Sequence, residues 1–256
     1  GEEEEPLQSS RSRKRPRRTT QILEVGAINT ELLDAAEATS TTTTTTTTEE
    51  KEKKKYNIHV RAIDIHSMDR RIEEADFLDL PYLHYDVQKR YDVIVCSMVL
   101  NCVTSPTDRG RMLCHLYHSL RPEGLVFLTL PKSCLFQSAF LTPSLFQDML
   151  QETGVGFELL STKQSPKVSF FVLQRPRNDE KRPSSSLDAT WTQLIIRNKG
   201  KKFPNQFSVV LQPQHIFGPL TRRTTTATTT KTIAKDNNLE NSMVKATIPK
   251  PRATLN

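Results

Sequence analysis

The sequence predicts an α/β fold in which helices cover a mostly parallel sheet, and three observations support this prediction. Short apolar runs alternate with helix-like runs over residues 21–151. The runs 91–97 and 125–130 are apolar nearly throughout, as expected of strands buried on both faces. The run 21–25 ends at one glycine, Gly26, directly before a helix-like run. A strand, a glycine turn and a helix in this order open a nucleotide-type βαβ unit.

Each expected strand is a short apolar or β-branched run, and each expected helix shows apolar residues on one face. The strands are expected at 21–25, 57–63, 91–97, 125–130 and 167–174, and residues 73–80 are expected to hold a short third strand and a turn into Pro81. The helices are expected at 30–38, 106–120 and 142–151. Thr107 is the expected N-cap of the second helix, and Pro143 after Thr142 opens the third. Residues 191–197 and 206–212 are expected to pair as antiparallel strands.

Composition divides the chain of 256 residues into one folded domain and two polar flanks. The folded domain is expected at 21–213, with residues 39–55 as a disordered insert and residues 175–190 as a linker. Residues 1–20 are expected to be a disordered segment of mixed charge, and residues 214–256 a disordered basic tail. A hydrophobic content of 36% is low for a wholly globular chain and agrees with this division.

The insert explains an unusual spacing between Gly26 and the next carboxylate at a strand end, Asp64. The two residues are 38 positions apart, whereas about 20 separate the corresponding residues of a nucleotide-type unit. The insert contains eight consecutive threonines, 41–48, and then a run of Glu and Lys. Such a run buries too little apolar surface to order itself. Without these 17 residues the spacing is 21, which restores the βαβ pattern.

The first turn carries a single glycine, in Glu24-Val25-Gly26, and this narrows the class of ligand. A dinucleotide site needs several glycines to hold a pyrophosphate, and the sequence contains neither that pattern nor a P-loop. S-adenosylmethionine (SAM) has no phosphate and therefore does not need several glycines. Its binding site must let the ligand approach the backbone closely and must offer a carboxylate to the ribose. The turn and Asp64 provide both. A purely structural βα turn in another α/β domain remains the alternative.

Cysteine usage and charge indicate the compartment and the class of partner. The four cysteines are scattered without a C-x-x-C pair, which is typical of reduced intracellular thiols. No apolar stretch approaches 18 residues, so no membrane partner is expected. Residues 177–256 carry 14 basic and 5 acidic side chains, whereas residues 19–176 have a net charge of −4. A basic tail attracts RNA phosphates, although solubility and nuclear import, for which the cluster 11–18 is suited, explain it equally well.

Five segments together resemble one family of enzymes, and they are 23–27, 62–65, 75–78, 91–103 and 120–124. The family is that of the fungal large-subunit (25S) rRNA adenine-N(1) methyltransferases, whose animal relatives include a SAM sensor upstream of the TOR kinase. The most specific part is the run Ser-Met-Val-Leu-Asn at 97–101. The resemblance implies a class I SAM-dependent methyltransferase fold, which is Rossmann-like with a mostly parallel sheet and an antiparallel C-terminal strand.

The resemblance assigns cofactor roles to residues at the ends of the first three strands. Gly26 would contact the methionine part of SAM, with Glu24 beside it as a further cofactor-binding residue, and Asp64 would hold the ribose hydroxyls. Asp76 and Phe77 would lie at the adenine ring, with the acid accepting a hydrogen bond from the amino group. A structural role stays open for two of them, since Asp64 can cap a helix and Asp76 can stabilise a turn.

The resemblance places the target base beside the end of the fourth strand, where Ser97 and Asn101 are the candidate catalytic residues. Adenine N1 has a free lone pair at neutral pH, so the methyl group can pass to it in line without a general base. The [DN]-P-P-[FY] pattern of amino-directed methyltransferases is absent from the sequence, which favours a ring nitrogen. A paired base must first be extruded, against Phe77, Met98 or Phe140. Asn101 can equally be a loop residue that only forms a structural hydrogen bond.

Two departures from the family bear on the function. Residues 137–140 read Gln-Ser-Ala-Phe where the family carries Asn-Ser-Arg-Tyr, so an arginine suited to RNA contact is lost. A helical segment ahead of the first strand is also missing, which suggests a truncated start. The first departure and the net negative charge of residues 19–176 favour an alternative function, a catalytically weak or inactive SAM-binding sensor that acts through a protein partner. The missing start leaves a third alternative, a degenerate fragment that binds no ligand. The basic flanks and the threonine repeats favour the enzyme.

The sequence thus predicts a SAM-dependent methyltransferase that acts on N1 of an adenine in large-subunit rRNA or the pre-ribosome. We expect it in the nucleus and nucleolus, as a monomer, with SAM as its cofactor. Cys114, His115 and His118 fall within one helical turn, but no fourth ligand follows, and helix packing explains them better than a metal does. No metal site is therefore expected.

Overall fold

The computed structural model describes residues 18–41, 57–83, 86–151, 153–178 and 189–216, and all of them belong to one compact unit. The predicted disorder of the N-terminal segment, the insert, the linker and the tail falls largely outside these residues. At 39–41 the first residues of the predicted insert continue the preceding helix, because no helix-breaking residue separates them from it. Residues 214–216, predicted in the tail, belong to a short helix.

The described strands form one seven-stranded sheet with the order β3-β2-β1-β4-β5-β7-β6. They are β1 (Thr20–Val25), β2 (Ile58–Asp64), β3 (Glu73–Glu74), β4 (Tyr91–Ser97), β5 (Leu120–Pro131), β6 (Glu158–Gln164) and β7 (Val168–Gln174). β7 runs antiparallel to both its neighbours, and the other neighbouring pairs are parallel. The predicted fold class, a mostly parallel sheet with an antiparallel strand late in the chain, is confirmed.

One strand, β6, escaped prediction. It lies at the edge of the sheet, and its seven residues are exposed apart from one that is half-buried. An edge strand of this kind needs no continuous apolar run, so its sequence carries no strand signal. The expected strand at 125–130 is longer than predicted, because Leu120 already pairs with Tyr91 ahead of an irregularity in the register.

The described helices are α1 (Glu31–Thr41), α2 (Pro106–Ser119), α3 (Ser133–Phe136), α4 (Pro143–Leu150), α5 (Ala189–Thr192) and α6 (Pro213–Ile216), with 3-10 turns η1 (Phe77–Asp79) and η2 (Val87–Lys89). The prediction that Thr107 caps α2 is wrong, because Ser105 is the cap. Pro106 occupies the first helical position, where its missing N–H costs nothing, so the residue before it becomes the cap. Thr142 caps α4 in the same way ahead of Pro143, as predicted.

The prediction that residues 191–197 and 206–212 pair as strands is also wrong. Residues 189–216, called here the C-terminal strap, contain only the short helices α5 and α6. The strap crosses the start of α2, where Val210 N donates to Pro106 O at 2.9 Å. A Cβ on Gly110 of α2 would lie 1.9 Å from Val210 O, so the strap lies directly against the helix backbone. The apolar residues of the strap are therefore buried against a helix instead of a sheet.

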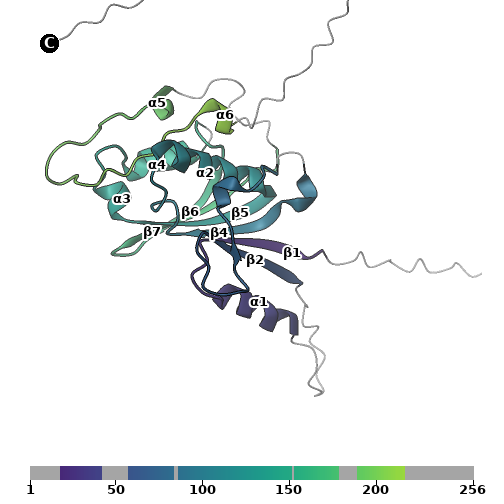
Figure 1. Cartoon of the computed structure of the whole chain (residues 1–256). Helices are drawn as coiled ribbons and strands as arrows, with labels where there is room; N and C mark the ends of the chain where they lie inside the picture. Colours follow the sequence, from purple (N-terminus) through teal and green to yellow (C-terminus); the bar gives the residue numbers. More distant parts are fainter. Residues whose placement is uncertain (1–17, 42–56, 84–85, 152, 179–188, 217–256) are drawn as a thin grey trace, which may run out of the picture. The chain divides into compact units, whose positions relative to one another are not determined.

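Helices cover both faces of the sheet. Figure 1 shows α1 on one side of the sheet and α2 and α4 on the other. The larger core includes most of α2, whose residues are buried from 109 to 119 except at one position. On the α1 side, Ala27, Ala62 and Ile72 form a small cluster against Leu33. The carboxyl ends of the parallel strands meet at one edge, and the loops at that edge are the expected place for a ligand.

Candidate functional site

The turn that follows β1 requires glycine at its first position. Gly26 has a φ of +74°, which glycine adopts without strain. The N–H groups of Gly26 and Ala27 both donate to Ile63 O, at 2.8 and 3.0 Å, so the turn is tied to β2. A Cβ on Gly26 would lie 2.3 Å from Val99 Cγ2, so the loop after β4 packs directly on the turn. Both neighbours of β1 in the sheet therefore hold this turn in place.

A cavity of about 490 Å³ lies beside the glycine turn, between the start of α1 and the loop after β2. Its lining residues are Ala27, Ile28, Asn29, Thr30, Asp64, His66, Met68, Asp69 and Ile72. The volume falls within the range of cofactor and small-molecule sites. Of the predicted cofactor residues, Asp64 lines the cavity, and Gly26 directly precedes its lining.

Asp64, the last residue of β2, combines a structural contact with an unused acceptor. Its Oδ1 accepts a hydrogen bond from His66 N at 2.8 Å, which closes a turn at the end of the strand. Its Oδ2 receives no hydrogen bond from the residues that the structure describes. The structural role that the sequence left open is thus real, and it leaves one carboxylate oxygen available for a hydroxyl group.

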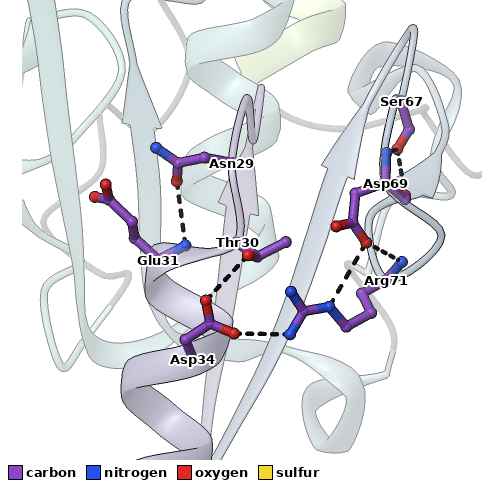
Figure 2. A network of polar contacts seen from close by, with 7 residues as sticks. All are labelled: Asn29, Thr30, Glu31, Asp34, Ser67, Asp69 and Arg71. Carbon is purple, nitrogen blue, oxygen red and sulfur yellow. Dashed lines mark hydrogen bonds and ion pairs between the residues drawn. The ribbon is translucent and has the colours of Figure 1, made fainter.

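Figure 2 shows a polar network that joins the two walls of the cavity. Arg71 Nη1 donates to Asp34 Oδ1 at 2.7 Å, and Thr30 Oγ1 donates to Asp34 Oδ2 at 3.0 Å. The hydrogen bond from Arg71, followed by that from Thr30, lowers the pKa of Asp34. Arg71 N also donates to Asp69 Oδ1 at 2.8 Å. Since Thr30 and Asp69 line the cavity, Arg71 holds α1 and the loop after β2 at a fixed separation.

Replacing Arg71 by alanine is therefore expected to weaken cofactor binding modestly. The ion pair is exposed and screened by solvent, so its loss should lower the affinity for SAM by no more than about fivefold. Calorimetric titration of the full chain with SAM measures the change. Arg70→Ala is the matched control, since Arg70 is exposed and forms no ion pair with a described residue. Equal affinities in the two variants would show that Arg71 does not position the cavity walls.

Two buried acceptor atoms near the glycine turn lack a hydrogen-bond donor among the described residues. They are Glu24 Oε2 on β1 and Asn101 Oδ1 in the loop after β4. Burial, and next the charge of Glu31, raises the pKa of Glu24. A buried acceptor without a donor is costly, and a ligand that brings ammonium or N–H groups relieves that cost. The two atoms therefore fit ligands rich in nitrogen donors.

Asp76 and Phe77 do not line the cavity. Asp76 caps η1, because its Oδ1 accepts a hydrogen bond from Leu78 N at 2.8 Å. This is the turn role that the sequence left open. The Phe77 ring is 3% exposed and stacks on His115 with 4.5 Å between the ring centroids. The Phe77 ring thus belongs to the core, whereas the exposed Asp76 carboxylate stays accessible to a ligand.

The loop after β4 brings the candidate catalytic residues close to the glycine turn. Ser97 Oγ lies 2.9 Å from Thr129 Oγ1, and Met98 N donates to Thr129 O at 3.2 Å. Met98 has a φ of +60°, a conformation that few non-glycine residues adopt. This strained turn directs the loop so that Val99 packs on the glycine turn. Ser97 and Asn101 belong to this loop and do not line the cavity.

Most of the cavity-lining residues were not predicted. Residues 27–30 follow the glycine turn, and His66, Met68 and Asp69 follow Asp64. No motif marks them, because loop residues at strand ends are placed by the sheet and not by their own pattern. Their only signal in the sequence is that each follows the carboxyl end of a predicted strand by a few positions.

The histidines of α2 serve in packing. The His115 ring lies between Phe77 and Tyr82, and burial lowers its pKa to about 4. His118 Nε2 lies 2.9 Å from Ile216 O. Within the described ranges, no group of three or more His, Cys, Asp or Glu residues is placed to hold a metal ion.

None of the helices that the structure describes is both long enough and apolar enough to span a bilayer.

Comparison with known proteins gives one family match and one curated relative. A family model described as 25S rRNA (adenine(2142)-N(1))-methyltransferase, Bmt2, matches residues 4–209. A protein of Saccharomyces cerevisiae (strain ATCC 204508 / S288c), named 25S rRNA (adenine(2142)-N(1))-methyltransferase, is 32% identical over 116 residues. The aligned stretch covers 45% of this chain and 33% of the yeast protein, so the chain matches about a third of that relative's length.

Solved structures of methyltransferases are similar at low identity. The N-methyltransferase NodS from Bradyrhizobium japonicum WM9, in complex with S-adenosyl-L-homocysteine, has a TM-score of 0.40 and 11% identity over 61% of this chain and 78% of its own. A SAM-dependent methyltransferase from Mesorhizobium loti has a TM-score of 0.42 and 12% identity over 60% of this chain and 90% of its own. The fold assignment itself rests on the strand order and directions given above.

Proposed function

We propose that this chain, which belongs to the Bmt2 family of 25S rRNA (adenine(2142)-N(1))-methyltransferases, transfers a methyl group from SAM to N1 of an adenine in large-subunit rRNA. The family match over residues 4–209 includes every strand of the sheet. The yeast relative carries the same activity in its name, and the proposal extends that activity to this chain.

The observation that supports this function most is the cavity beside Gly26 with Asp64 in its wall. A single glycine turn allows a ligand to approach the backbone, and the Asp64 carboxylate has an oxygen free for a ribose hydroxyl. Glu24 Oε2 is a buried acceptor suited to the ammonium group of an amino acid. When bound, SAM supplies an electrophilic methyl group on its sulfonium. These residues bind and orient, and none has to move a proton.

The target base is assigned to the loop after β4. A neutral adenine N1 needs only alignment with the methyl group. The loop therefore has to hold the base so that N1, and no other acceptor atom, faces the methyl group. Asn101 Oδ1 is buried and receives no hydrogen bond from the described residues, so it can accept one from the exocyclic amino group of adenine. Ser97 is already paired with Thr129, which makes it a support for the loop.

The test is methyl transfer by the full chain to protein-free, unmodified 25S rRNA, read as 1-methyladenosine by mass spectrometry after digestion. Asp64→Asn is expected to weaken SAM binding about tenfold, because a neutral amide accepts hydroxyl hydrogen bonds less strongly than a carboxylate. Transfer at limiting SAM should fall to the same degree. Glu74→Gln removes an exposed carboxylate of β3 outside the cavity and is the matched control. A different methylated product, or equal SAM affinity in the two variants, would contradict the proposal.

The same experiment separates the enzyme from a SAM sensor of the kind related to the animal protein upstream of the TOR kinase. Residues 137–140 depart from the family pattern except at Ser138, and this serine has a structural role. Its Oγ donates to Phe207 O at 2.6 Å, which ties the run to the C-terminal strap. Binding of SAM that depends on Asp64 without any transfer would favour the sensor. We propose that the enzyme acts in the nucleolus. The basic cluster 11–18 is suited to nuclear import, which such a location requires.

A further inference from the structure

We infer that residues 197–202 of the C-terminal strap bind the phosphates of the RNA strand next to the target adenine. This segment, called the basic loop, reads Arg-Asn-Lys-Gly-Lys-Lys. Its four cations are Arg197, Lys199, Lys201 and Lys202. The inference rests on the proposed function and adds to it the surface that holds the RNA backbone.

The basic loop is a cluster of uncompensated charge. The strap holds four Lys and Arg residues and no Asp or Glu. All four cations are exposed, and none forms an ion pair with another residue in the described ranges. On the opposite edge of the sheet, exposed cations are paired, Lys89 with Asp86 and Arg177 with Glu123. Since residues 19–176 have a net charge of −4, attraction of RNA to this domain requires a local basic surface.

Hydrogen bonds on both sides hold the basic loop in one conformation. At its start, Asn198 Nδ2 donates to Ser138 O at 2.9 Å. After it, Asn205 N donates to Gln137 O at 3.0 Å. Between them the chain turns at Gly200, which has a φ of +107°. The cations are therefore presented from a preformed loop, and binding a phosphate strand costs little ordering of the backbone.

The strap also connects the basic loop to the residues assigned to the target base. Arg109 of α2 donates from Nε to Val103 O and from Nη1 to Ser208 O, each at 2.8 Å. Its guanidinium lies 4.7 Å from the centre of the Phe207 ring. Val103 belongs to the loop that carries Asn101. Figure 1 shows the segment between α5 and α6 passing beside α3, on the side where β5 ends. The basic loop thus lies at the edge of the sheet that carries the proposed site.

The surface next to the basic loop suits unpaired nucleotides. Leu194, Ile195 and Ile196 precede the loop and are 51%, 41% and 57% exposed. Three consecutive exposed aliphatic side chains beside four cations offer apolar contact to bases and charge to phosphates. Single-stranded RNA presents both groups, whereas a duplex hides its bases. We therefore assign the single-stranded nucleotides that flank the target adenine to this surface.

The test compares two double variants of the full chain that remove the same charge. Lys199→Ala with Lys201→Ala removes two cations of the basic loop, and Lys89→Ala with Arg177→Ala removes two from the opposite edge. Binding of a protein-free 25S rRNA transcript is measured at several salt concentrations, and SAM affinity is measured by calorimetry. The first variant should bind RNA about tenfold more weakly and lower the salt slope by about 1.4, which is two contacts at about 0.7 each. Its SAM affinity should not change, and the control should change the slope little.

Each outcome bears on one proposal. Equal RNA affinities and salt slopes in the two double variants would overturn the inference that the basic loop binds RNA. The inference would also fail if the unaltered protein did not bind the transcript. RNA binding that depends on the loop, in a protein that transfers no methyl group, would support the loop and count against the proposed enzyme. Loss of SAM binding in the loop variant would show that the strap acts through the fold, which also overturns the inference.

Discussion

Gly26→Ala is expected to abolish SAM binding at concentrations that saturate the unaltered protein. The alanine Cβ would lie 2.3 Å from Val99 Cγ2, in a backbone conformation with a φ of +74°. The left-handed backbone costs about 1–2 kcal/mol for a residue with a Cβ, and overpacking costs about 1–3 kcal/mol. The turn can relieve both costs by moving, which removes it from the ligand. About 3 kcal/mol corresponds to a loss of roughly a hundredfold in affinity.

Two further variants separate the causes of this loss, and calorimetry with SAM measures all three. Gly200→Ala introduces a Cβ at a φ of +107° where nothing lies within 4 Å, so it tests the backbone penalty away from the cavity and should leave SAM affinity unchanged. Val99→Ala in the Gly26→Ala background removes the contact and should recover part of the affinity. If Gly26→Ala binds SAM like the unaltered chain, the turn is only structural, which is the alternative that the sequence left open.

Glu24→Gln is expected to have opposite effects on stability and on cofactor affinity. Burial raises the pKa of Glu24 above its usual value of 4.5 in the folded chain. A raised carboxyl pKa contributes stability below the unfolded pKa, and that stability is lost as the pH rises through the folded pKa. At neutral pH the charged Glu24 therefore destabilises the free protein, and the neutral glutamine should raise the unfolding temperature. SAM affinity should fall about tenfold to a hundredfold, because a charged hydrogen bond to the ammonium group is lost.

Thermal unfolding with and without SAM checks both effects. At pH 7 the variant should unfold at a higher temperature than the unaltered chain without SAM, and gain less when SAM is added. The difference without SAM should shrink as the pH falls and Glu24 becomes protonated in the folded chain. Glu74→Gln, at an exposed position, should change neither quantity. A lower unfolding temperature for Glu24→Gln would mean that the carboxylate has a structural donor, and its assignment to the cofactor would fail.

Local patterns were sufficient for the elements around the candidate site. β1, the turn at Gly26 and α1 were predicted because a buried apolar run, a single glycine and a helical face follow one another. β4 was predicted because it is buried between two parallel neighbours and is therefore apolar along its length. Asp64 could be identified only after the threonine insert had been removed from the spacing, and the structure then places it in the cavity wall. These features depend on residues close in the sequence, so the sequence displays them.

The sequence by itself determined the parallel strands of the sheet, the glycine turn and the carboxylate at the end of β2, since each follows from the order and period of apolar residues. Only the tertiary structure decided which side chains surround them. The contact of Val99 with Gly26 and that of the strap with Gly110 join residues that are far apart in the chain. The family resemblance implies that Phe77 lies at the adenine ring, yet the ring stacks on His115, a residue of α2 that no local pattern associates with it. Contacts of this kind arise when separate elements pack, and local periodicity carries no information about them.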